Sequence, residues 1–178
     1  PFDAMPKVVN PPSGFVQNCN SSPFETTLGA GNPRPEDFPA STGIETGMTN
    51  RALRALELLG ADSAITDAEL RDIKFDVTVS ERSELFAYLE RALAAVDAAG
   101  SGADVLETSA TELLRSWDRR ADSGSRATTL ALLTLYPLIQ AHHDGRPEPD
   151  PRASLRAAAR LLTTRHGRLD PPWSWVNR

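Results

Sequence analysis

Over most of the chain, apolar residues recur every three or four positions, which is the spacing of helices that bury one face. The first such segment, residues 49–60, has Thr49 or Asn50 as a candidate N-cap, a stripe of leucines, and Gly60 as a stop. The second begins at Thr66, and the glutamate three positions later completes a capping box. The pattern therefore predicts two short helices at the start of a helical region.

Two longer segments with a single apolar stripe follow. Ser80 is the predicted N-cap of the first, which runs to Gly100. Its buried stripe is expected to consist of Leu85, Leu89, Leu93 and Val96. The stripe of the second segment consists of Leu106, Ala110, Leu113 and Trp117. Both stripes predict helices that bury one face.

The segment 125–145 is apolar on nearly every side, as expected of a buried helix. Because Pro137 has no backbone N–H, we expect it to kink the helix or to end it after Tyr136. A last helix is predicted between Asp150, as its cap, and Gly167, as its stop. The helical region therefore contains five or six helices.

Residues 1–47 differ in composition from the helical region 48–178. They hold most of the fourteen prolines and many Ser, Thr and Asn residues, and residues 29–43 are expected to be an extended loop. The one strand-like piece lies near Phe15–Asn18. We therefore predict a mainly α-helical chain with a short strand near Phe15–Asn18. A loop as long as the one that follows is uncommon unless it is functional or covers a site.

Composition limits the classes of function. The chain has 178 residues, 40% of them hydrophobic, which suits one domain with a real core. The net charge of −5 and the lack of a basic cluster argue against nucleic-acid binding. No apolar run is long enough to predict a transmembrane helix. The single cysteine, Cys19, excludes an internal disulfide and a multi-cysteine metal site.

Histidine and cysteine are the first candidates for chemistry. His142, His143 and His166 lack a third ligand at a metal-site spacing such as H-E-x-x-H, and histidines near a helix C-terminus interact favourably with its dipole. We therefore interpret them as helix-end residues. Cys19 is far in sequence from any histidine base, so packing is its expected role, although a contact in the folded chain stays open.

Serines and acidic residues offer no known catalytic motif. The chain contains no G-x-S-x-G elbow, no phosphate-binding loop and no dinucleotide fingerprint. Asp122, Ser123 and Ser125 suit the N-terminus of a helix, and Asp118 and Arg119 suit a salt-bridged helix end. These residues are therefore expected to be structural.

Two asparagines, Asn18 and Asn20, follow the strand-like piece and would point to the same side of a strand. Before two serines and a proline they suit a turn closed by their own side chains. Alternatively, an amide NH2 held at a strand end can donate a hydrogen bond to an oxyanion, as asparagine does in acyl-transfer sites. On the residues alone, both interpretations stay open.

Four stretches resemble, in their order along the chain, the penicillin-amidase family of N-terminal-nucleophile hydrolases. They are MPKVVNPPSGFVQNCNSSPF, TNRALRALELL, LLRSWDRRADSGSRATTLALL and HGRLDPPWSWVNR. The family includes penicillin acylases, aculeacin-type acylases and acyl-homoserine-lactone acylases, and the likeness covers essentially the whole chain. It implies that the parent protein has a four-layer αββα fold, of the α+β class, with most of this segment forming helices at its periphery.

The resemblance also implies a mechanism. Members are made as a precursor, or zymogen, that cleaves itself into two chains. The new N-terminal serine of the larger chain is the nucleophile, with its own α-amino group as base. One backbone N–H and one asparagine side chain form the oxyanion hole, which places that role at Asn20, and the arginine that organises the site falls at Arg51. The nucleophile is expected ahead of this chain, so Ser21 and Ser22 are not assigned that role.

We expect from this resemblance an amidohydrolase acting on an N-acyl compound of the penicillin, acyl-homoserine-lactone or acyl-peptide type, with a possible link to antibiotic metabolism and no cofactor. Some members bind structural calcium, but no ligand cluster here supports it. Expected partners are the remainder of the precursor and the small-molecule substrate, not nucleic acid or membrane, and the expected location is periplasmic or secreted.

The chain itself is then expected to be an excerpt of the larger chain that is inactive alone. Residues 1–47 would be a strand plus a long loop with part of the active site, and residues 48–178 a helical segment of the same domain. The residues leave one hypothesis of another class open. The chain could be a stand-alone helical binding or interaction module without catalysis, because it holds no recognisable nucleophile.

Overall fold

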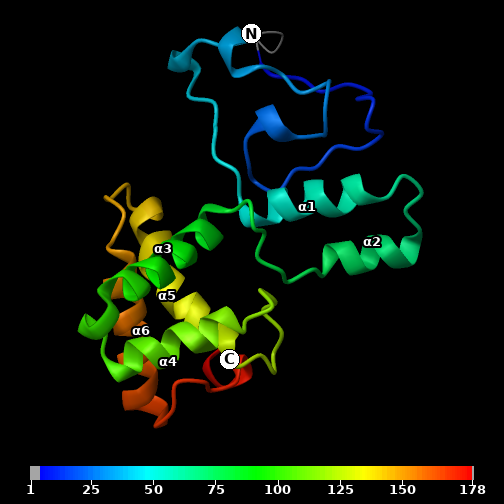
Figure 1. Cartoon of the computed structure of the whole chain (residues 1–178). Helices are drawn as coiled ribbons and strands as arrows, with labels where there is room; N and C mark the ends of the chain where they lie inside the picture. The colour runs from blue at the N-terminus through cyan, green and yellow to red at the C-terminus, as the bar shows by residue number, and fades with distance from the viewer. Residues whose placement is uncertain (1–4, 178) are drawn as a thin grey trace. The chain divides into compact units, whose positions relative to one another are not determined.

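The computed structural model describes residues 5–177. They form α-helices joined by loops, and no β-sheet is present among them, so the predicted mainly helical character is confirmed (Figure 1). Contacts between residues divide the chain into two compact units, Pro1–Asp76 and Val77–Arg178. The loop-rich segment therefore belongs to the same unit as the first two helices. Among the described helices, none is both long and apolar enough to cross a membrane.

The first unit combines the long loop with α1 (Asn50–Ala61) and α2 (Asp67–Lys74). Both helices begin as predicted, because Thr49 caps α1 and Thr66 forms a capping box at α2. Three turns of 3-10 helix interrupt the loop, namely η2 (Pro23–Glu25), η3 (Pro35–Asp37) and η4 (Ala40–Thr42). Gly60 lies inside the last turn of α1 rather than beyond it.

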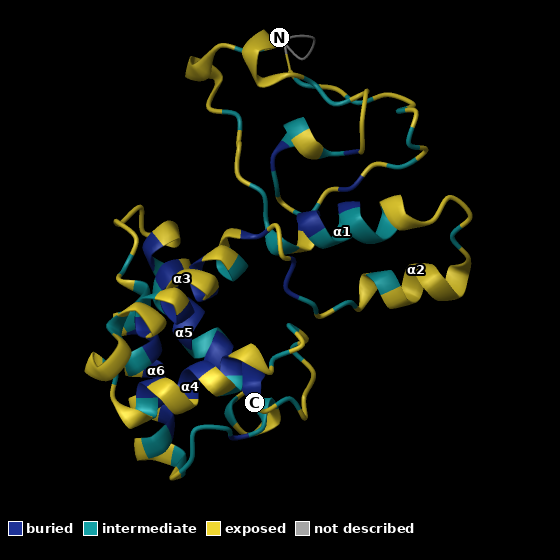
Figure 2. Cartoon of the chain, in the orientation of Figure 1, coloured by how far each residue is buried: buried dark blue, intermediate teal, exposed yellow. Residues whose placement is uncertain are grey.

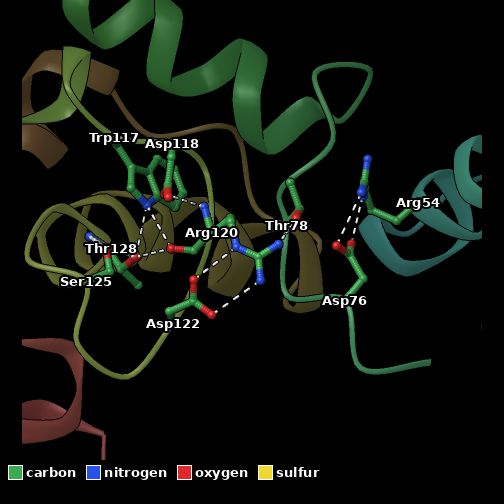
Figure 3. A network of polar contacts seen from close by, with 9 residues as sticks. All are labelled: Arg54, Asp76, Thr78, Trp117, Asp118, Arg120, Asp122, Ser125 and Thr128. Atoms are coloured by element: carbon green, nitrogen blue, oxygen red, sulfur yellow. Dashed lines mark hydrogen bonds and ion pairs between the residues drawn. The ribbon is translucent and has the colours of Figure 1, made fainter. Parts of the chain in front are cut away.

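An ion pair joins α1 to the segment that follows α2. Arg54 Nε lies 2.8 Å from Asp76 Oδ2, and both side chains are largely buried (Figure 3). The guanidinium also pairs with Glu57 one turn further along α1. The contact with Asp76 ties α1 to the segment that leaves α2, whereas the contact with Glu57 lies within α1.

The short strand expected near Phe15–Asn18 is not formed. The stretch is extended. Within the described residues, a single backbone hydrogen bond joins it to another segment, and in this bond the Gln17 N–H donates to the Thr26 carbonyl at 2.9 Å. Side chains take the place of a ladder, since the carbonyl of Phe15 accepts the hydroxyl of Thr27 at 2.8 Å. The loop therefore satisfies its backbone with its own Ser, Thr and Asn side chains, which a regular strand does not need.

The second unit is a bundle whose helices bury a common apolar core. Its helices are α3 (Glu84–Ala99), α4 (Val105–Arg115), α5 (Ala127–His143), α6 (Pro151–His166) and the short α7 (Trp173–Val176), with a 3-10 turn, η5 (Gly100–Gly102). Figure 2 shows the buried faces of α3, α4, α5 and α6 turned toward one another. Half of the residues of the two predicted stripes lie in this core and the other half pack against it. The core contains Leu89, Leu93, Val96 and Ala110, and the residues packed against it are Leu85, Leu106, Leu113 and Trp117.

α3 begins three residues later than predicted. Its N-cap is Ser83, whose hydroxyl accepts the backbone N–H of Phe86 at 3.2 Å. Ser80 lies in the turn before the helix, and its carbonyl accepts the Ser83 hydroxyl at 2.7 Å. Both serines are buried and have the same local capping chemistry, so the sequence pattern does not distinguish them.

We expected Pro137 either to kink α5 or to end it after Tyr136, and the helix does not end there. It continues through the proline to His143. Leu135 and Leu138, on either side of the proline, are almost completely buried in the core. Their burial offsets the hydrogen bond that the proline removes, because burying one leucine contributes roughly 1.5–3 kcal/mol.

A buried carboxylate holds α4 to α6. The Glu107 side chain is 1% exposed, and its Oε1 lies 2.8 Å from Arg152 Nε and 2.9 Å from Arg156 Nη2. Its Oε2 accepts the backbone N–H of Asp104 and completes the capping box of α4. The hydrogen bond from Arg152 above all, with those from Asp104 and Arg156, lowers the pKa of Glu107 to about 2.

This low pKa makes the stability of the second unit sensitive to acid. Because the pKa of Glu107 is lower in the folded protein than its ordinary 4.5, its contribution is complete above about pH 4.5 and is lost as the pH falls toward about 2. We expect the group to contribute about 3 kcal/mol of unfolding free energy that disappears over this window. Urea unfolding of the intact protein at a series of pH values measures it.

The variant Glu107→Gln should be less stable at neutral pH by roughly 3 kcal/mol, because two arginines lose their buried partner. Between about pH 4.5 and about pH 2, the stability of the variant should also fall less than that of the wild type. Glu112→Gln, which changes an exposed glutamate of the same helix, serves as the control and should behave like the wild type. An acid profile of Glu107→Gln that matches the wild type would contradict the assignment.

Candidate functional site

A tight turn carries the two asparagines. The Asn18 Oδ1 accepts the backbone N–H of Asn20 at 3.3 Å, which is the side-chain-closed turn that the sequence suggested for Asn18. Asn20 has a φ of +55°, in the left-handed region that asparagine tolerates better than most residues. Both side chains are exposed in the described chain. The turn therefore presents the Asn20 amide on the surface of the first unit.

Arg51 lies in the first turn of α1 and reaches the turn directly. Its Nη2 donates to Asn20 Oδ1 at 2.9 Å, so the structure brings together two residues that are 31 positions apart. An asparagine amide has one acceptor oxygen and an NH2 with two donors. Since the oxygen of Asn20 is taken by the arginine, the NH2 group, which makes no hydrogen bond within residues 5–177, is the end that can donate to another group.

The pair contributes geometry rather than stability. Both side chains are exposed, and an exposed contact of this kind contributes at most about 1 kcal/mol. A guanidinium keeps its charge at any physiological pH, and a hydrogen bond to the amide oxygen polarises the amide, which strengthens its N–H donors. Together Arg51 and Asn20 offer an oriented, electron-poor NH2 group with no charge of its own.

Two more hydrogen bonds hold the turn and its loop against the start of α1. The Thr49 hydroxyl donates to the carbonyl of Cys19 at 3.0 Å, and the Ser22 N–H donates to the carbonyl of Gly47 at 2.9 Å. The loop that leaves after Ser22 therefore returns to the same place at Gly47. The sequence predicted Thr49 only as a helix cap, and no local pattern indicates a contact between residues 30 positions apart.

The loop between these two points encloses a small apolar pocket. Its volume is about 270 Å³, and its walls are Phe24, Pro35, Phe38, Pro39, Ala40, Thr42, Ile44 and Thr46. The rings of Phe24 and Phe38 lie 5.8 Å apart, centre to centre, in a tilted arrangement. The pocket is thus made by the loop alone and begins four residues after Asn20.

The other sequence candidates lie at structural positions. Cys19 is half-buried, and its carbonyl is the group that the structure engages. His142 and His143 lie in the last turn of α5, and His166 ends α6, as predicted for helix-end residues. His143 Nδ1 contacts Asp144 at 3.0 Å, and the contact lowers the pKa of that carboxyl. No group of three potential ligands that could hold a metal ion occurs within the described residues.

Asp118 and Arg119, expected at a salt-bridged helix end, do not pair with each other. Asp118 Oδ1 instead accepts the backbone N–H of Arg120 at 2.9 Å, and Arg119 pairs with Glu81 at 3.0 Å. Arg119 has a φ of +65°, in the left-handed region, so the chain turns at this residue. The two side chains therefore serve different contacts.

The rest of this polar stretch is a closed network (Figure 3). Trp117 Nε1 donates to the Thr128 hydroxyl at 2.9 Å, and Arg120 pairs with Asp122 at 3.0 Å. Ser125 Oγ accepts the N–H of Thr128 at the start of α5, as predicted for a helix N-terminus. These contacts link the end of α4 to the start of α5, so the stretch is structural.

The family model described as penicillin amidase matches residues 1–177, which is nearly the whole chain. The match includes the turn with Asn20, the start of α1 with Arg51, and all the helices of the second unit.

Proposed function

The chain belongs to the penicillin amidase family, and on this premise we propose that it forms part of an enzyme that hydrolyses the amide bond of an N-acyl compound. Membership indicates an acylase-type hydrolase. The hydrogen bond from Arg51 to the oxygen of Asn20 is the observation that supports a catalytic role for this chain. It leaves the NH2 group of Asn20 to act as a donor.

In the proposed reaction, the nucleophile is the N-terminal serine of a chain released by self-cleavage of a precursor, and it lies outside the 178 residues. Its α-amino group takes the hydroxyl proton while the oxygen attacks the acyl carbon. The carbonyl oxygen becomes an oxyanion, which accepts a hydrogen bond from Asn20 and one from a backbone N–H elsewhere in the precursor. The intermediate collapses, the protonated amine leaves, and water hydrolyses the acyl ester.

Asn20 suits this role because its donor is neutral and its orientation is fixed. A neutral amide binds the developing charge without a proton transfer of its own. The negative charge exists only during the reaction, so the interaction favours the transition state over the substrate. Arg51 keeps the amide from turning its oxygen toward the oxyanion, which would repel it. Losing one oxyanion donor typically reduces kcat by roughly 10²–10³-fold.

The wider context is part of the same proposal. The partners are the remainder of the precursor and an N-acyl substrate of the penicillin, acyl-homoserine-lactone or acyl-peptide type, and the reaction uses no cofactor. The proposed location is periplasmic or secreted. A stand-alone binding module differs from this in one testable respect, because it would turn over no N-acyl substrate.

Replacing Asn20 by aspartate separates catalysis from structure. Asn20→Asp keeps the shape and the contact to Arg51 but replaces the NH2 donor by an anionic oxygen. In the intact enzyme, we expect kcat to fall by roughly 10²-fold or more with little change in KM, and Asn20→Ala to do the same. Steady-state kinetics with a panel of phenylacetyl and fatty-acyl nitroanilides measures both constants.

Asn10→Asp is the matched control, because Asn10 is also exposed and also has a positive φ, of +47°. It should turn over like the wild type. Near-normal turnover of Asn20→Asp would remove Asn20 from the reaction, whereas a lack of turnover in the wild-type protein would favour the binding-module hypothesis.

Replacing Arg51 tests the orientation of the amide. Arg51→Ala frees Asn20 Oδ1, so we expect turnover to fall about tenfold or more, or self-cleavage to fail, because a small misplacement of a catalytic group is costly. Gel electrophoresis of the precursor and its products, together with kcat, measures both effects. Arg71→Ala changes an exposed arginine of α2 in the same unit and is the control. Normal processing and normal turnover of Arg51→Ala would refute the role.

A further inference from the structure

We infer that Thr49 is a positioning residue of this oxyanion site, because its hydroxyl orients the backbone of Asn20 as Arg51 orients the side chain. The inference rests on the proposed function of Asn20. It adds a residue that neither contacts the substrate nor belongs to the predicted site. Its position, directly before α1, is that of an ordinary helix cap.

The Thr49 hydroxyl is the acceptor of one hydrogen bond and the donor of another. It accepts the backbone N–H of Ala52 at 3.2 Å, which caps α1, and it donates to the carbonyl of Cys19 at 3.0 Å. A hydroxyl has one hydrogen to donate, and here the hydrogen goes to the turn while the oxygen serves the helix. The start of α1 and the turn at Asn20 are therefore joined through a single oxygen atom.

The carbonyl of Cys19 belongs to the same planar peptide unit as the N–H of Asn20. Thr49 holds the oxygen of this unit, and Asn18 Oδ1 holds its N–H at 3.3 Å. Rotation of the plane would change the φ of Asn20, which is +55° and lies in a narrow allowed region. Because the plane is held from both sides, the direction in which the Asn20 side chain leaves the backbone is fixed.

Arg51 completes the arrangement from the same turn of the helix. Its contact with Asn20 Oδ1 at 2.9 Å sets the rotation of the amide once the backbone is in place. The start of α1 therefore controls the backbone through Thr49 and the side chain through Arg51. An oxyanion donor needs both to be correct, since its hydrogen must meet the oxyanion at a defined distance and angle.

Thr66 provides an internal comparison, because it caps α2 in the same unit. Its hydroxyl accepts the N–H of Glu69 at 3.3 Å but donates to the carboxylate of the same Glu69 at 2.6 Å. Removing it costs a helix cap and no link to another segment. The two threonines therefore share a capping role, but only the hydroxyl of Thr49 links its helix to a distant segment.

The experiment uses the intact enzyme and three variants. Thr49→Val keeps the shape and loses the hydroxyl, Thr49→Ser keeps both hydrogen bonds, and Thr66→Val loses a cap alone. We expect Thr49→Val to reduce kcat about tenfold or more with KM changed less than about twofold, because only a contact of the transition state is misplaced. Thr49→Ser should restore kcat to within about twofold of wild type.

Rates are measured per amount of folded protein with the best nitroanilide substrate, and thermal unfolding is followed in parallel. Thr49→Val should lower the unfolding temperature at least as much as Thr66→Val, because it loses the contact to Cys19 in addition to a cap, while Thr66→Val keeps the wild-type kcat. In the Asn20→Asp background, Thr49→Val should reduce kcat little further, since both changes act on the same donor.

Three results would overturn the inference: a wild-type kcat in Thr49→Val, a failure of Thr49→Ser to restore it, or an equal loss in Thr66→Val. The proposed function has a separate outcome. If Asn20→Asp turns over normally, the oxyanion role itself is wrong. If Asn20→Asp is inactive while Thr49→Val is normal, only the positioning role of Thr49 is wrong.

Discussion

The contact between the start of α1 and the turn at residues 18–20 is the interaction on which the first unit depends. Thr49 and Arg51 reach back across about thirty residues of loop and hold Cys19 and Asn20. The contact ties the loop-rich segment to α1, which holds the buried apolar residues Ala52, Leu53 and Leu56 of the described part of this unit. One helix end therefore supplies both the architecture and the proposed chemistry of this unit.

The two units are stabilised in different ways. The second unit buries apolar faces of four helices and secures them with one nearly inaccessible glutamate, Glu107, between two arginines. The first unit relies on side chains that bind the backbone, such as Asn32, whose amide holds the N–H groups of Thr26 and Thr27 and the carbonyl of Thr27. Each such bond contributes only about 1 kcal/mol, so order in this unit comes from many small terms.

The sequence predicted best what is decided locally. The caps at Thr49, Thr66 and Asp150 follow from the chemistry of the first helical turn, and the structure has all three. The prediction of a strand near Phe15–Asn18 was wrong, because a strand needs a pairing partner that no local pattern specifies. α5 passes through Pro137 because packing outweighs a lost hydrogen bond. The approach of Arg51 to Asn20 was expected from the family resemblance alone. The two residues are 31 positions apart, and no local pattern indicates a contact over that separation.

The hydrogen bond between Ser22 and Gly47 has a consequence for how this protein can diversify. The two ends of the loop are fixed next to each other. Changing the number of residues between them therefore costs little free energy of folding. Doubling the length of such a loop costs only about 0.6 kcal/mol of closure entropy. Insertions, deletions and changes of its apolar pocket can therefore accumulate without moving Asn20 or Arg51. A loop of this kind lets evolution, or an engineer, vary the surroundings of a site while the site itself stays in register.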